Sequence, residues 1–158
     1  IANLTANGLL LGANGKSKLE IEQMVDFLGA RIQASAGKEG SYVSAGFLAK
    51  NTDIMLPLIQ SVLMKPDFVT EEFDKLKQRE IADLSRAKES PRSVIGRYFD
   101  HLVFQDHPYG NATSGDSESL AAIKVQDLRA FHTSFYQPAN TAINIVGDFD
   151  VKDMRAEI

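Results

Sequence analysis

The amino-acid sequence predicts an α+β fold in which an antiparallel-rich sheet is covered by helices. Two neighbouring segments, 31–36 and 42–48, have the character of strands, and a short glycine-bounded turn separates them. Most of the remaining chain repeats its apolar residues at the three-to-four-residue spacing of helices. A last apolar segment at 142–146 predicts one further strand that returns to the sheet after the helices.

Length and composition are those of one globular domain. The chain has 158 residues, enough for a single domain over 1–158 that buries an apolar core. Hydrophobic residues make up 44% and charged residues 24%, which argues against disorder and against a coiled coil. Because Ile1 already lies inside an apolar pattern, we expect the chain to be part of a longer protein with a strand region upstream.

Charge and hydropathy exclude some classes of partner. The net charge is −4 and no run of lysine or arginine occurs, so nucleic acid is not an expected partner. No apolar stretch approaches the roughly 20 residues of a membrane-spanning helix, so no membrane segment is expected. The chain has no cysteine, which excludes disulfides and thiolate ligands but leaves periplasm, cytoplasm and mitochondrion equally open.

The start of the chain is predicted to form two helices. Leucines within 4–11 give a short helix that should end at Gly12, where a run with turn chemistry begins. Ser17 and Glu20 have the spacing of a capping box, which places the start of a second helix there. Gly29 is the expected end of that helix.

The second half of the chain is predicted to be mainly helical. Apolar residues at helical spacing lie in the segments 54–63, 73–84, 94–104, 119–123 and 125–135. Thr70 is expected to cap the second of these helices, whose closely mixed acids and bases are typical of a solvated, ion-paired face. The final strand at 142–146 should end at Gly147.

The three histidines have no pattern typical of a metal site. None of His101, His107 and His132 has a second histidine or an acid four residues away. We expect His101 to be partly buried in its helix and His107 to cap backbone in its turn. His132, between Phe131 and Phe135, is expected to pack with its polar tip in water.

Other catalytic motifs are missing from the sequence. There is no Gly-x-Ser-x-Gly elbow and no glycine-rich phosphate-binding loop. The acids between Glu71 and Asp83 alternate with lysines and arginines, which favours surface ion pairs over a catalytic carboxylate pair. An enzyme that combines these acids with His101 and His107 is the alternative.

Several segments together resemble the amino-terminal type of domain in the insulinase (pitrilysin) family of zinc metallopeptidases. The segment 17–34 resembles the family's helix, its glycine turn and its peptide-binding edge strand. Further matches follow in the family's order over nearly the whole chain: Pro66-Asp67-Phe68, Glu71-Glu72-Phe73, His107-Pro108-Tyr109-Gly110, Tyr136-Gln137-Pro138-Ala139-Asn140 and Val146-Gly147-Asp148-Phe149. Each match is short, but their joint order and spacing are specific. The resemblance implies the LuxS/metallopeptidase-like α+β fold of that family.

The resemblance also implies a lost zinc site. Active members of the family carry His-x-x-Glu-His on the first helix, where two histidines bind zinc and the glutamate activates water. This motif falls on Asn3-Leu4-Thr5-Ala6-Asn7, and a third family ligand, a glutamate, falls at about Asp83, with Ala82 as the alternative position. Because amides are poor zinc ligands and alanine accepts no proton, we expect no catalytic residue, no metal ligand and no cofactor here. A site for a hard cation formed by the two asparagines and Asp83 is the alternative.

By the same resemblance, the chain is a catalytically inactive domain or subunit that pairs with an active zinc-peptidase domain and helps to enclose unfolded peptide. Extended peptide is expected to bind along the exposed edge of the strand at 31–36, through main-chain hydrogen bonds. The expected peptide-binding residues are Ile32, Gln33, Ala34, Ser35 and Ala36. A proline at position 35 is expected to remove one edge donor. A peptidase with a non-standard metal site and a purely structural assembly subunit are the alternatives.

Overall fold

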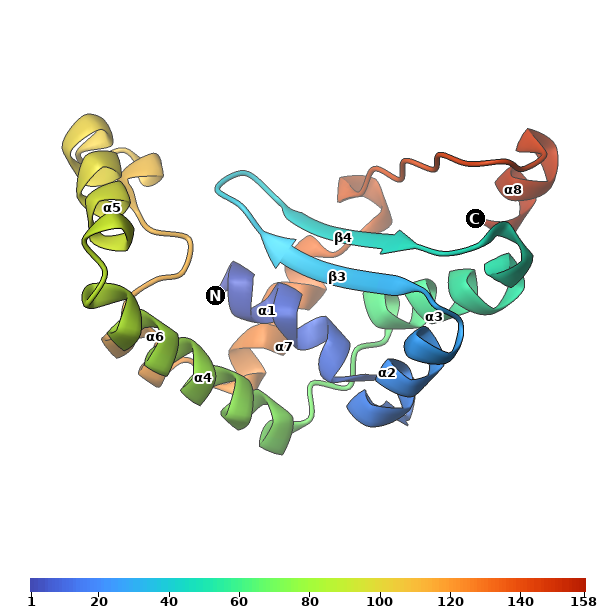
Figure 1. Ribbon diagram of the computed structural model, residues 1–158, viewed down its shortest axis with the longest axis horizontal. Helices are drawn as coiled ribbons and strands as arrows, with labels where there is room; N and C mark the ends of the chain where they lie inside the picture. The colour runs from blue at the N-terminus through green and yellow to red at the C-terminus, as the bar shows by residue number, and fades with distance from the viewer.

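A β-hairpin with helices beneath one face forms the body of the molecule, as the computed structural model shows (Figure 1). The structure describes residues 1–158, apart from the side chains of residues 93 and 97. Helices α1 (Ala2–Gly8), α2 (Lys18–Phe27) and α7 (Val125–Phe135) lie below the hairpin in Figure 1. This arrangement confirms the predicted α+β fold.

The chain between the first two helices follows the predicted turn chemistry. Helix α1 continues into a 3-10 turn, η1 (Leu9–Leu11), and the short strands β1 (Gly12–Ala13) and β2 (Lys16–Ser17) pair with each other. The φ angle of Gly12 is 144°, and a Cβ there would lie 3.2 Å from a backbone oxygen, so this turn requires glycine. Ser17 then starts α2 through the predicted capping box with Glu20.

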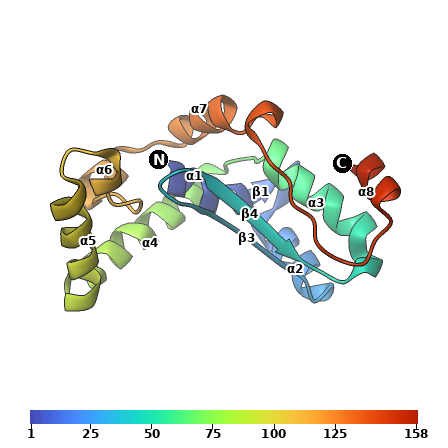
Figure 2. The ribbon, with the colours of Figure 1, turned by 90° about the horizontal axis from the view of Figure 1, so that it is seen from above.

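The predicted hairpin is formed by β3 (Arg31–Ala36) and β4 (Ser41–Gly46). The strands are antiparallel, with Ile32 opposite Ala45 and Ala34 opposite Val43. The Gly37 amide donates a hydrogen bond to the Gly40 carbonyl at 2.8 Å and closes the turn. Figure 2 shows α3 (Thr52–Met64) and the segment before α8 (Val151–Glu157) on the β4 side of the hairpin.

The other helices also lie close to their predicted positions. They are α4 (Thr70–Lys88), α5 (Pro91–Phe104) and α6 (Ser117–Ala122), with single 3-10 turns η2 (Ala49–Asn51), η3 (Pro108–Gly110) and η4 (Pro138–Asn140). The predicted cap of α4 was one residue late. Val69, in extended conformation, precedes the helix and Thr70 is already its first residue, so the threonine side chain does not cap it.

The apolar core surrounds α1, which contacts β3, α4 and α7. Its largest members are almost fully buried and come from α1, η1, α2, α3, the segment before α4 and α4 itself: Leu4, Leu9, Ile21, Met55, Val62, Phe68 and Phe73. Leu128 of α7 closes the core from below and is fully buried. The first helix is therefore a central packing element of the fold.

The predicted final strand at 142–146 was wrong. Residues 141–146 have no regular secondary structure, and Val146 is 97% exposed. A strand is held by hydrogen bonds to a neighbouring strand, and in the described part of the chain β4 pairs with β3 alone. The segment has the apolar composition of a strand but no partner with which to form one.

Helix α5 projects from the body near the tip of the hairpin (Figure 1). Its apolar residues have helical spacing, as predicted, but Ile95, Phe99 and Leu102 are 68%, 61% and 76% exposed. Among the described helices, none combines the length and the hydropathy that crossing a bilayer requires.

Candidate functional site

Helix α1 carries Asn3 and Asn7 four residues apart, and both side chains are half-buried. Between them, the Thr5 hydroxyl donates to the Ile1 carbonyl at 3.2 Å, and Ala6 is fully buried. These residues do not fit a zinc ion, because amide oxygens are weak zinc ligands and Ala6 offers no base. Among the described side chains, no group of three or more His, Cys, Asp or Glu could hold a metal ion.

Asp83 lines neither the cavity that contains Asn3 nor the groove that contains Asn7. Asp83 is exposed and pairs with Arg86 on the next turn of α4. A different acid of α4, Glu80, lines a cavity of about 110 Å³ together with Asn3. Burial, and secondarily the Asp83 carboxylate, raise the pKa of Glu80. The alternative of a hard-cation site on the asparagines and Asp83 is therefore not supported by their placement.

A groove of about 590 Å³ lies beside the first half of β3, between α1, α2 and α4. Its buried lining is apolar and consists of Leu11, Ile21, Val25, Ala30 and Leu76. Asn7 of α1 and Gln33 of β3 add neutral polar groups. The groove thus combines an apolar floor with polar walls and opens next to a strand.

Charged side chains surround this groove. They are Lys18, Glu22 and Asp26 of α2, Arg31 of β3, and Glu72, Lys75 and Arg79 of α4. Each lysine pairs with a glutamate on its own helix, at 3.7 Å on α2 and 2.8 Å on α4. Neither arginine forms an ion pair within the described side chains, and neither does Asp26. The groove therefore has one basic group more than it has acidic groups.

The outer edge of β3 has unpaired backbone groups. In an antiparallel pair, residues alternate between those bonded to the partner strand and those that point outward. The Gly37 to Gly40 hydrogen bond sets the alternation, so Ser35 is bonded to Tyr42 of β4. Ile32, Ala34 and Ala36 direct their amides and carbonyls outward.

The expected effect of a proline at Ser35 must accordingly be corrected. That substitution would remove a bond to β4 and weaken the hairpin itself. The equivalent substitution at Ala34 removes an outward donor and leaves the bonds to β4 in place. The predicted stretch from Ile32 to Ala36 remains a prediction, and its outward-facing members are now assigned.

The three histidines have separate structural settings. His107 accepts a hydrogen bond from the Tyr109 amide at Nδ1, at 3.2 Å, which is the predicted capping role. His132 stacks on Tyr136 with ring centroids 4.9 Å apart, and its Nε2 contacts the Leu63 carbonyl at 2.8 Å instead of water. His101 is exposed, contrary to the prediction, because the face of α5 that carries it is uncovered.

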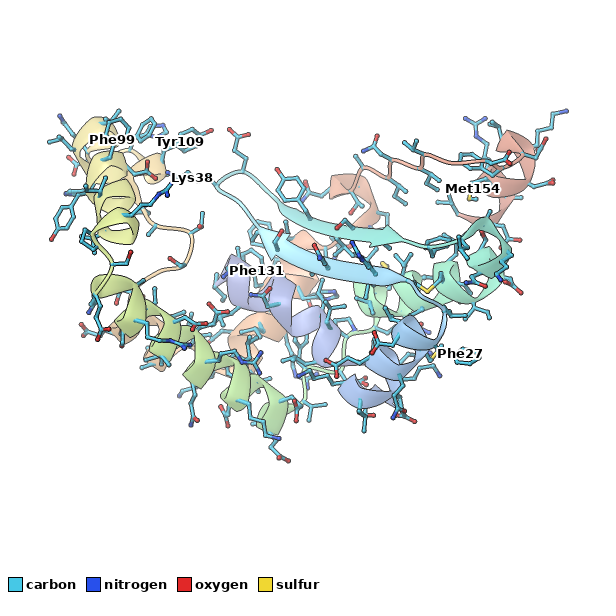
Figure 3. The ribbon with its side chains drawn as sticks, in the orientation of Figure 1. Phe27, Lys38, Phe99, Tyr109, Phe131 and Met154 are labelled. Carbon is cyan, nitrogen blue, oxygen red and sulfur yellow. The ribbon has the colours of Figure 1, made fainter. Side chains whose placement is uncertain are left out.

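One contact had no signal in the sequence. Lys38, at the tip of the hairpin, donates to the Asp100 carboxylate at 2.6 Å and to the Tyr109 carbonyl, and Figure 3 shows it pointing toward Tyr109. The Tyr109 hydroxyl donates to Glu39, and this hydrogen bond raises the pKa of Tyr109. The partners of these three hydrogen bonds are far apart in the chain: Lys38 and Asp100 by 62 residues, Lys38 and Tyr109 by 71, and Glu39 and Tyr109 by 70. Local patterns cannot reveal such pairs.

Two family models match the chain. The model described as insulinase (peptidase family M16) matches residues 1–117. The model described as peptidase M16 inactive domain matches residues 122–158. Together they cover most of the chain and agree with the resemblance noted in the sequence.

Relatives include both zinc proteases and a non-peptidase. An uncharacterized zinc protease of Mycobacterium leprae (strain TN) is 22% identical over 148 residues, which cover 94% of this chain and 33% of the relative. The non-peptidase homolog YmxG of Helicobacter pylori is 22% identical over 152 residues, which cover 96% and 35%. The chain thus spans about a third of the length of the curated relatives it matches.

Solved structures show the same fold. A peptidase M16 inactive domain from Pseudomonas fluorescens matches with a TM-score of 0.78 and 28% identity, over 82% of this chain and 32% of that one. A protease from Helicobacter pylori matches with a TM-score of 0.87 and 21% identity, over 99% and 38%. Because the Helicobacter pylori protease is only 21% identical to this chain, its match shows a shared fold and nothing about function.

Proposed function

Because the chain belongs to the insulinase family (peptidase family M16) and is a domain of its inactive type, we propose that it acts by binding extended peptide along β3. In this proposal it pairs with an active zinc-peptidase domain or subunit of the same family. The active partner supplies catalysis, since the residues at 3–7 cannot hold zinc or activate water. This chain supplies part of the surface that encloses the peptide.

The observation that carries the proposal is the free edge of β3 beside the groove. β3 pairs with β4 on one side, and no other described strand pairs with it on the other. The outward amides and carbonyls of Ile32, Ala34 and Ala36 form a template for a further strand. Main-chain pairing of this kind binds extended peptides of many sequences, as capture of unfolded chains requires.

The side chains along the edge favour close approach. Ala34, Ser35 and Ala36 are small, so another backbone can come within pairing distance without steric conflict. The helices below β3 hold the strand in place, because Ile32 and Ala34 pack against the core. A rigid edge loses little conformational entropy when a peptide pairs with it.

The test uses a fluorescent peptide of about ten residues, long enough to match a strand, with alternating threonine and valine around one central glutamate. Its affinity is measured by fluorescence anisotropy for the parent chain, Ala34→Pro and Ala34→Ser. We expect the proline to weaken binding about tenfold by removing one outward donor and disturbing the edge. The Ala34→Ser variant keeps the backbone donor and should bind the peptide like the parent chain.

Folding of each variant is checked by circular dichroism. Should Ala34→Pro fail to fold, the peptide carries the test instead: single N-methyl groups placed along it should weaken binding at every second position. Equal binding by all N-methylated peptides and by a folded Ala34→Pro would rule out pairing along β3. The chain would then be better described as a structural subunit.

A further inference from the structure

A peptide paired with β3 directs every second side chain toward the helices below. Side chains alternate between the two faces of a strand, and Ile32 and Ala34 lie on the face that packs against the core. Beside that face, the groove is bounded by Asn7 of α1 and by Arg79 of α4. A peptide side chain on this face therefore enters the groove.

Among the charged groups around the groove, Arg79 forms no ion pair with a described side chain. Lys18 and Lys75 are paired with glutamates, as described above. Asp26 of α2 and Arg31 of β3 also line the groove with opposite charges, and neither forms an ion pair with a described side chain. The acids nearest to Arg79 on α4 have other settings: Glu72 is bonded to Lys75, and Glu80 lines the separate cavity beside Asn3, although the charge of Arg79 reaches both carboxylates.

We infer that Arg79 makes the β3 site selective for peptides that bring a carboxylate into the groove. A guanidinium presents a planar fork of donors that matches the two oxygens of a carboxylate. The side-chain amide of Asn7, on the facing helix, is a further donor on the same groove. The inference rests on the proposed function, because the peptide must first pair with β3.

Two sources can supply this carboxylate: an internal aspartate or glutamate, or the free end of the peptide. Three peptides separate them. The first has the central glutamate and an amidated end, the second has glutamine in its place and an amidated end, and the third has glutamine and a free carboxyl end. We expect the glutamate peptide to bind about fivefold more tightly than the amidated glutamine peptide, the scale of a solvated ion pair. A gain by the third peptide instead would assign the site to the peptide terminus.

The protein variants show whether Arg79 is responsible. Arg79→Gln should abolish the preference between the first two peptides. Arg79→Lys should retain part of the preference, because it keeps the charge but loses the fork. Arg86→Gln is the matched control: it removes the same group from the same helix, outside the groove, where Arg86 pairs with Asp83. It should keep the full preference.

The outcomes distinguish this inference from the proposed function. If all three peptides bind equally to the parent and to Arg79→Gln, while N-methylation still acts at every second position, the charge selection is wrong and edge pairing stands. If a preference persists unchanged in Arg79→Gln, the selecting group is a different one and the inference is overturned. The preference should also shrink as salt rises from about 50 mM to 500 mM, because ions screen solvated pairs.

Discussion

Helices α1 and α5 are both apolar by sequence, yet their burial is opposite. In α1, Leu4 and Ala6 are 1% and 0% exposed. In α5, Ile95 and Leu102 are 68% and 76% exposed. Apolar spacing therefore predicts that a helix has an apolar face, but it does not predict what covers that face within one chain.

Among the described side chains, helix α1 is also held to the rest of the molecule by more apolar packing than α5 is. Helix α1 contacts β3, α4 and α7 through a continuous apolar core. Helix α5 is attached through its junction with α4, through η3, and through the ion pair of Lys38 with Asp100. A packed core resists changes in volume, whereas an exposed helix tolerates them. Matched substitutions in the two regions should therefore have unequal effects.

The largest expected difference is between two phenylalanines. Phe73, at the start of α4, is 1% exposed, whereas Phe99 of α5 is 61% exposed. Phe73→Ala should lower the free energy of unfolding by about 3–5 kcal/mol, because it removes buried apolar surface and leaves a cavity. Phe99→Ala should change it by about 0.5 kcal/mol or less.

Urea unfolding followed by circular dichroism measures both values on the same chain. Similar losses for the two variants would mean that α5 is covered in solution, for example by self-association. Repeating the measurement at several protein concentrations would reveal that case, since association makes stability depend on concentration.

Most of the fold could be predicted from the sequence because its signals are local. The capping box of Ser17 and Glu20, the alternation at 31–36 and the helical period of 125–135 each involve residues close in the chain. The predicted strand at 142–146 was wrong for a nonlocal reason: composition gave it the character of a strand, but a strand also requires a neighbour. The exposure of His101 was missed for the same reason.

The candidate site was predictable in part. The lack of zinc donors at 3–7 is a property of residue identity, so the sequence was sufficient to recognise it. The groove was not predictable, because Asn7, Arg31 and Arg79 come from three separate elements. Likewise, the outward direction of the Ala34 amide depends on pairing register, which requires the hairpin itself.

Alanine substitutions at two helical glycines, one in α1 and one in α5, should change the stability of the protein in opposite directions. A Cβ at Gly8 of α1 would lie 3.1 Å from the Phe68 ring and 3.2 Å from Leu128, both of which are buried. A Cβ at Gly96 of α5 would meet no described atom within 4 Å. Gly8→Ala should destabilise the fold by about 1–3 kcal/mol through overpacking, whereas Gly96→Ala should stabilise α5 by about 0.5–1 kcal/mol.

Thermal unfolding of the two alanine variants, compared with the parent, measures the sign of each change. A stabilising Gly8→Ala would mean that the core around Phe68 yields to an added methyl group. In that case the contrast between a rigid core and a permissive helix would not hold.

The smallest expected difference concerns how the helices start. At α2, the Ser17 hydroxyl and amide both donate to the Glu20 carboxylate, at 2.7 and 2.8 Å. At α5, Ser90 precedes Pro91 and makes no side-chain capping bond. Ser17→Ala should cost about 1 kcal/mol at neutral pH, whereas Ser90→Ala should cost much less.

The stability lost in Ser17→Ala should depend on pH, and the direction of this dependence follows from the pKa of Glu20. Hydrogen bonds from the Ser17 side chain, and then from its backbone, lower the pKa of the Glu20 carboxyl. A group with a lowered folded-state pKa contributes stability above its unfolded value of about 4.3 and loses it as pH falls through the folded value. The destabilisation by Ser17→Ala should therefore be largest near pH 7 and shrink below about pH 4.

Other carboxyl groups titrate alike in both proteins, so the parent-minus-variant difference in urea unfolding isolates this contribution. The same difference measured in a Glu20→Gln background should be independent of pH; a dependence that survives there would assign the titration to a different carboxyl group.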